Sequence, residues 1–77
     1  MVKTIEFEGA KVKYDDSLLH KWSFMKKIMD PQEQFSAMDD LLVGKSDEVA
    51  SKLNDSMDKM TELLTRIVTI EGNAAKN

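Results

Sequence analysis

The spacing of apolar residues changes once along the chain, near residue 15, and this change separates two kinds of structure. Up to that point, apolar and charged residues alternate on both sides of a Glu-Gly pair. Alternation with a period of two around a turn is typical of a β-hairpin with one buried face. We therefore predict a two-stranded hairpin over residues 2–14, whose inward face carries Ile5, Phe7, Val12 and Tyr14.

Beyond residue 15, apolar residues recur at intervals of three and four, which is the period of amphipathic helices. Asp15 or Asp16 can accept hydrogen bonds from the first free amides of one helix, and Asp30 followed by Pro31 is typical of a second helix start. Gly44 supplies a left-handed residue that can end this second helix. The predicted helices cover about residues 16–29, 31–43 and 46–71.

The last of these segments permits two forms. Its apolar stripe continues from Val49 to Ile67, as in one long helix. Asn54 and Asp55 interrupt the stripe with side chains that compete for backbone amides, so the alternative is a break there, with Asp55 capping a fourth helix. In both forms the helix ends at Gly72, and we expect residues 73–77 to form a disordered tail.

These elements predict a mainly α fold in one small domain, residues 1–72, with the hairpin in front of the helices. Trp22 lies on the first predicted helix, and a Trp side chain can bury about 200 Å². We therefore place Trp22 at the centre of the core. The other helix residues expected there are Leu42, Leu53, Met60 and Leu64.

Charge is distributed unevenly along the chain. The net charge is −3, but residues 1–29 carry +2 and residues 30–77 carry −5. An acidic surface repels phosphate backbones, so we expect no nucleic-acid binding and disfavour a helix-turn-helix protein. Cys is absent, so neither disulfides nor thiolate metal sites are expected. Because no apolar run approaches the roughly 20 residues of a membrane span and no secretory signal is recognisable, we expect a cytoplasmic protein without membrane contact.

The residues that catalysis requires are scarce. His20 is the single histidine, and no nucleophile motif accompanies any serine. The pairs Asp39-Asp40 and Asp47-Glu48 are adjacent in sequence, and neighbouring residues of a helix point in different directions. We therefore expect a protein that is not an enzyme and has no cofactor and no metal site, with His20 on the flank of a helix.

Methionine is unusually frequent, with six in 77 residues. Its flexible, polarizable side chain can fill irregular gaps in a core, or it can line a surface that adapts to different partners. Most of these residues stand at core-type helical positions, which favours core filling. They are Met25, Met29, Met38, Met57 and Met60.

Several short motifs follow one another in a recognisable order. An Ile-Glu-Phe-Glu-Gly hairpin returns through Val-Lys-Tyr at residues 12–14 and is followed by an Asp-Asp-Ser cap. Further along are Lys-Trp-Ser-Phe-Met at 21–25, Leu-Leu-Val-Gly at 41–44 and Met-Thr-Glu-Leu-Leu at 60–64. In this order the chain resembles the small tail assembly chaperones of long-tailed bacteriophages and related prophages, over roughly residues 3–71.

The resemblance implies a non-enzymatic factor of virion morphogenesis in the host bacterial cytoplasm. Such a factor binds the tape-measure protein and tail-tube subunits during assembly and is absent from the finished tail. The resemblance also implies a short and a frameshift-extended form, of which this chain would match the short one. The alternative is a small phage or bacterial adaptor or inhibitor that docks on a host protein through the hairpin edge.

The last helix is the predicted contact surface for a long helical partner, and its acidic residues favour a basic partner. Apolar residues there span more than one helix face, so we also expect a homo-oligomer. The predicted partner-binding residues are Leu63, Ile67, Ile70, Met57 and Met60.

Overall fold

The two strands of the hairpin, β1 (Val2–Phe7) and β2 (Ala10–Asp15), are antiparallel and are joined by Glu8 and Gly9 alone. Both turn residues have positive φ, 52° and 82°, which is the geometry that matches the right-handed twist of the flanking strands. Alternate side chains point toward the helices. Phe7, Val12 and Tyr14 are buried there as predicted, and Ile5 is half-buried.

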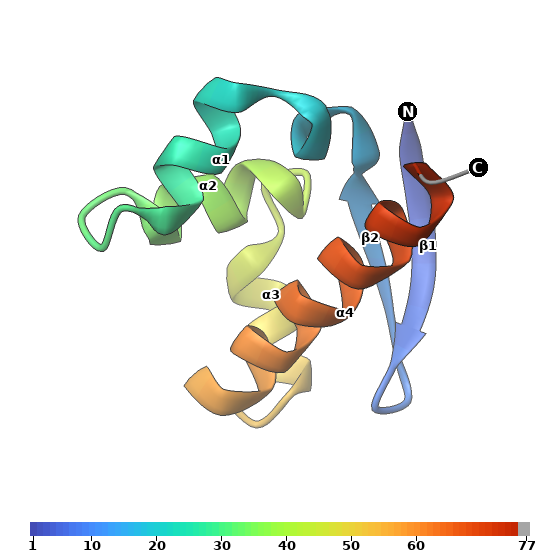
Figure 1. Ribbon diagram of the computed structural model, residues 1–77. Helices are drawn as coiled ribbons and strands as arrows, with labels where there is room; N and C mark the ends of the chain where they lie inside the picture. Colours follow the sequence, from blue (N-terminus) through green and yellow to red (C-terminus); the bar gives the residue numbers. More distant parts are fainter. Residues whose placement is uncertain (76–77) are drawn as a thin grey trace.

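The structure is a computed structural model that describes the backbone of residues 1–75 and the side chains of residues 1–72. After the hairpin comes a 3-10 turn, η1 (Asp16–His20), and then four helices (Figure 1). These are α1 (Trp22–Met29), α2 (Gln34–Leu41), α3 (Ser46–Lys52) and α4 (Met57–Ala75). The predicted mainly α fold with an N-terminal hairpin is confirmed.

The predicted first helix, residues 16–29, is in fact two pieces. Asp15 caps η1, because its Oδ1 accepts hydrogen bonds from the backbone N–H and the hydroxyl of Ser17. Lys21 is extended, with φ −102° and ψ 126°, and it separates η1 from α1. This break changes which side chains of α1 face inward, so Phe24 and Ile28 are buried.

Trp22 was expected at the centre of the core, and this prediction is wrong: its side chain is 79% exposed. The break at Lys21 rotates Trp22 outward and places Phe24, which is 4% exposed, in the interior instead. Leu42 and Leu53 are buried as predicted, whereas Met60 and Leu64 are only partly buried against the core.

Pro31 does not begin the second helix. The carboxylate of Asp30 accepts a hydrogen bond from the backbone N–H of Gln32, and its carbonyl accepts one from that of Glu33. These bonds close a separate turn, so α2 starts at Gln34, three residues later than the predicted 31–43 helix. The helix also ends earlier, at Leu41, because the two residues after Leu42 have positive φ.

The last segment takes the broken form rather than the continuous helix 46–71. Asn54 and Asp55 have φ of 61° and 55°, and the N–H of Asp55 donates to the carbonyl of Ala50. Ser56, not Asp55, caps α4, because its hydroxyl accepts from the N–H of Lys59. α4 continues through Gly72 to Ala75, so the predicted end at Gly72 is wrong; residues 76–77 of the expected tail lie outside the described residues.

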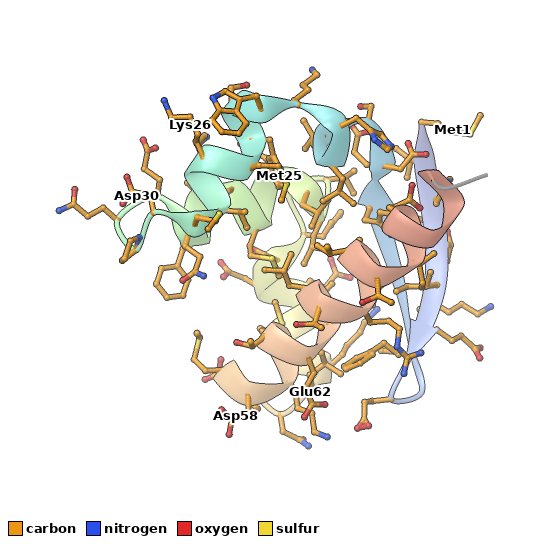
Figure 2. The ribbon with its side chains drawn as sticks, in the orientation of Figure 1. Met1, Met25, Lys26, Asp30, Asp58 and Glu62 are labelled. Atoms are coloured by element: carbon orange, nitrogen blue, oxygen red, sulfur yellow. The ribbon has the colours of Figure 1, made fainter. Side chains whose placement is uncertain are left out.

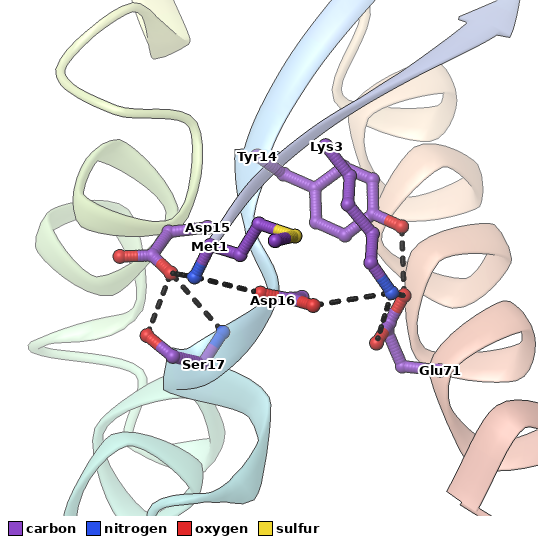
Figure 3. Close-up of polar contacts among 7 residues, drawn as sticks. All are labelled: Met1, Lys3, Tyr14, Asp15, Asp16, Ser17 and Glu71. Atoms are coloured by element: carbon purple, nitrogen blue, oxygen red, sulfur yellow. Dashed lines mark hydrogen bonds and ion pairs between the residues drawn. The ribbon is translucent and has the colours of Figure 1, made fainter.

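One hydrophobic cluster joins the hairpin to all four helices. α4 runs across the hairpin, with its last turns beside the beginning of β1 (Figure 1). Polar contacts secure both ends of this crossing. Lys59 Nζ lies 2.6 Å from Glu8 Oε1 at the hairpin turn, and Lys3 and Tyr14 both contact Glu71 near the other end of α4 (Figure 3).

Candidate functional site

A groove of about 480 Å³ lies between α2, α3 and the beginning of α4. Its walls are largely apolar. Phe35 and Met57 are unusually exposed for such side chains, at 65% and 57%, while Met38 is buried and Met60 is half-buried. Further apolar lining comes from Ala50 and Leu64. The groove therefore presents flexible thioether side chains and an aromatic ring that the core leaves uncovered.

The spacing of residues along α4 explains why this helix lines the groove. Met57, Met60, Thr61 and Leu64 are separated by three, one and three positions, so they lie on one helix face. A different face, with Leu63 and Ile67, enters the core. α4 thus contributes side chains from one face to the groove and from another face to the core.

A polar contact between α2 and α3 shapes the opposite wall. Asp39 on α2 accepts hydrogen bonds from the backbone N–H of Ser46, at 3.2 Å, and from its hydroxyl, at 2.6 Å. Ser46 is the first residue of α3, whose flanking residue Lys45 provides no side-chain cap. Because the free amides of a helix start need acceptors, Asp39 caps α3 from a neighbouring helix and holds the two walls together.

The charged residues that line the groove are all acidic. Asp39, Asp47 and Asp55 contribute carboxylates, and the remaining polar lining consists of neutral Gln, Ser and Thr side chains. All lining residues belong to the described part of the chain, and none of them is Lys, Arg or His. A ligand in the groove would therefore meet an apolar surface beside negative charge.

The structure divides the predicted partner-binding residues into three groups. Met57 and Met60 line the groove. Leu63 and Ile67 are completely buried, so their prediction as contact residues is wrong: the rotation of α4 turns them into the core. Ile70 is 37% exposed but does not line the groove.

Phe35, Asp39 and Asp47 line the groove but were absent from the predicted contact surface. Phe35 stands three residues before the buried Met38 in the apolar spacing of α2, but it lies in the exposed first turn of this helix, which the spacing itself does not reveal. An Asp residue seven positions before Ser46 carries no short-range capping signal either. Only the meeting of α2 and α3 makes these residues neighbours.

Metal-ligating side chains do not gather within the part of the chain that the structure describes. Among residues 1–75, no three His, Cys, Asp or Glu side chains are placed to hold a metal ion. His20 is exposed and borders a second cavity of only about 130 Å³, together with Glu71. The Glu71 carboxylate already accepts hydrogen bonds from Tyr14 and Lys3.

Within residues 1–75, none of the helices combines the length and apolar character required to cross a membrane. Comparison with protein-family models, with curated proteins and with solved structures gives no match for this chain.

Proposed function

We propose that the protein is a non-enzymatic tail assembly chaperone that binds the tape-measure protein of a phage tail in the host cytoplasm. The observation that carries this proposal is the apolar groove between α2, α3 and α4, with Phe35 and Met57 exposed at its walls. The sequence resemblance supports a tape-measure protein as the partner, and the groove supports binding through exposed apolar side chains.

An amphipathic helix is the ligand that such a groove accommodates best. A helix places apolar side chains at intervals of three and four on one face, and these can enter an apolar groove side by side. The methionines Met57 and Met60 can adjust to side chains of different shape. A tape-measure protein is a long helical chain with apolar stripes, so many copies of one adaptable groove could cover it before the tail tube forms.

The acidic lining favours a bound segment that carries positive charge. Asp47 and Asp55 are exposed beside the apolar lining, where they attract basic side chains that flank an apolar stripe. Exposed charges act mainly on the association rate and are screened by salt. Binding of a basic amphipathic segment should therefore be faster at low ionic strength.

Co-expression with the tape-measure protein tests this proposal, using wild type and two single variants. Met57→Lys places a positive charge in the acidic groove at a side chain that is 57% exposed. Ile70→Lys makes the same charge change on the same helix outside the groove and is the matched control. Circular dichroism of the purified variants establishes that each is folded.

Wild type and Ile70→Lys should keep the tape-measure protein soluble and co-purify with it, and Met57→Lys should not. Equal co-purification by the three proteins would place binding outside the groove. Failure of wild type to solubilise or bind the tape-measure protein would reject the chaperone proposal. The adaptor or inhibitor that docks through the hairpin edge would then be the function to test.

A further inference from the structure

A second exposed surface lies on α1, outside the groove. Trp22, Lys26 and Met29 follow one another at intervals of four and three, so they form one stripe along this helix. Trp22 is 79% exposed and Met29 is 78% exposed. Lys26, between them in sequence, projects outward from α1, away from Asp58 and Glu62 at the beginning of α4 (Figure 2).

The α1 stripe carries the positive charge of Lys26 beside its apolar side chains, and Lys21 lies directly before the first residue of the helix. Among the described side chains, Lys21 and Lys26 form no ion pair, whereas their neighbour Lys27 lies 3.4 Å from Asp40. Their charges are therefore available to a partner. An exposed Trp beside unpaired Lys side chains is chemically suited to a surface that offers both apolar contact and carboxylates.

The groove on the same protein offers that combination. Its thioether side chains, Met57 and Met60, can contact an indole ring favourably, and Asp47 and Asp55 can pair with Lys side chains. We propose that two copies of this protein associate head to tail, with the α1 stripe of one copy seated in the groove of the next.

Charge favours this arrangement over contact between identical surfaces. Two α1 stripes facing each other would bring Lys26 of both copies together, and two grooves would bring their Asp47 and Asp55 carboxylates together. Both symmetric contacts oppose like charges, whereas the stripe and the groove have opposite charge. Contact between two different surfaces leaves one stripe and one groove free in every dimer, so longer chains or rings can follow.

The association should be weak. Helix α1 has eight residues, so its exposed stripe covers less than the roughly 800 Å² per partner that a stable interface buries. We expect assembly at high micromolar concentration that decreases with added salt, because the attracting charges are exposed. Without another partner, each groove would then be covered by the α1 stripe of a second copy. A helical partner would compete with that copy for the groove.

Two variants that each lack one surface test the arrangement. Trp22→Asp removes the stripe and also the only tryptophan of the chain, and Met57→Lys disrupts the groove. In a mixture of the two, all tryptophan emission comes from the stripe of the Met57→Lys protein. Asp47→Lys is a second groove variant in case Met57→Lys alters folding. Neither the mixture nor its readout requires the tape-measure protein, so its failure is distinct from failure of the proposed function.

Wild type should sediment with a mass that rises with concentration above the 8.8 kDa monomer, and each variant alone should remain monomeric. Mixing Trp22→Asp with Met57→Lys should restore a dimer and shift the tryptophan emission to shorter wavelength. A strictly monomeric wild type, self-association of either variant alone, or a mixture that stays monomeric with unchanged emission would overturn the proposal.

Discussion

The hydroxyl of Tyr14 donates a hydrogen bond of 2.8 Å to Oε2 of Glu71, joining β2 to the far end of α4 (Figure 3). Both side chains are buried, and Lys3 Nζ reaches the same carboxylate oxygen at 3.1 Å. A buried carboxylate is costly unless donors compensate its lost hydration. Tyr14 and Lys3 supply those donors, and their contacts hold the hairpin against the helix.

Tyr14→Phe should lower the free energy of unfolding by about 1–3 kcal/mol, because the buried carboxylate of Glu71 loses a donor. Urea denaturation measures this change. The double variant Tyr14→Phe/Glu71→Leu should lose less than the sum of its two single variants, since neither partner then remains unpaired. Additive losses would mean that the two side chains do not act on each other.

Alkaline pH should destabilise the protein through the same tyrosine. Burial, and after it the hydrogen bond to Glu71, raise the pKa of Tyr14 from 10.0 to about 12. A raised pKa means that the folded protein holds the proton more tightly than the unfolded chain, so this stabilisation is complete below pH 10 and is lost as the pH rises toward 12. The raised pKa of Lys3, from 10.5, acts in the same direction.

Tyr14 is the only tyrosine, so the absorbance of tyrosinate reports its titration without ambiguity. The folded protein should titrate well above an unfolded control, and Tyr14→Phe should weaken the dependence of unfolding free energy on alkaline pH. Titration of the folded protein at the same pH as the unfolded control would contradict this account.

At acidic pH, Asp16 should contribute to loss of stability. Hydrogen bonds from the N-terminal ammonium and from Lys3 lower the pKa of Asp16 below 3.8. A lowered pKa in the folded state gives stabilisation that is present above pH 3.8 and is lost as the pH falls through the folded value. Urea midpoints measured across this range should depend less on pH in Asp16→Asn than in wild type. An unchanged pH dependence would show that the carboxylate does not take part.

The two aromatic residues of α1 should respond in opposite ways to truncation. Trp22→Ala should change the free energy of unfolding by less than about 0.5 kcal/mol, because the side chain is 79% exposed. Phe24→Ala should cost about 3–5 kcal/mol, because its ring is buried in the core. Thermal and urea denaturation of both variants provide the test. The reverse order would mean that α1 presents the opposite face to the core.

The hairpin was predictable because its signals are local. Alternation over a few residues determines which face of each strand is buried, and a Glu-Gly pair can adopt the positive φ values of a tight turn. Helix ranges were less predictable. Lys21 is extended, and Asp30 closes a separate turn. Each interrupts a predicted helix and changes where the following helix begins, and apolar spacing alone does not reveal either break.

The candidate site was predictable only in part, for a related reason. The stripe on α4 contains both core and groove residues, and their separation depends on how α4 is rotated against its neighbours. Two of the predicted contact residues, Met57 and Met60, line the groove, while two others, Leu63 and Ile67, are buried in the core. The acidic lining arises where α2, α3 and α4 meet, and no sequence window contains all of it.

Amide chemical-shift mapping during titration with a helical segment of the tape-measure protein tests the central claim most directly. If the groove receives the helix, the largest changes should occur at Phe35, Ala50 and Met57, and Ile70 should change little. The Met57→Lys variant should show no saturable change at these positions. Changes concentrated along the hairpin, with the groove residues unaffected, would contradict the account.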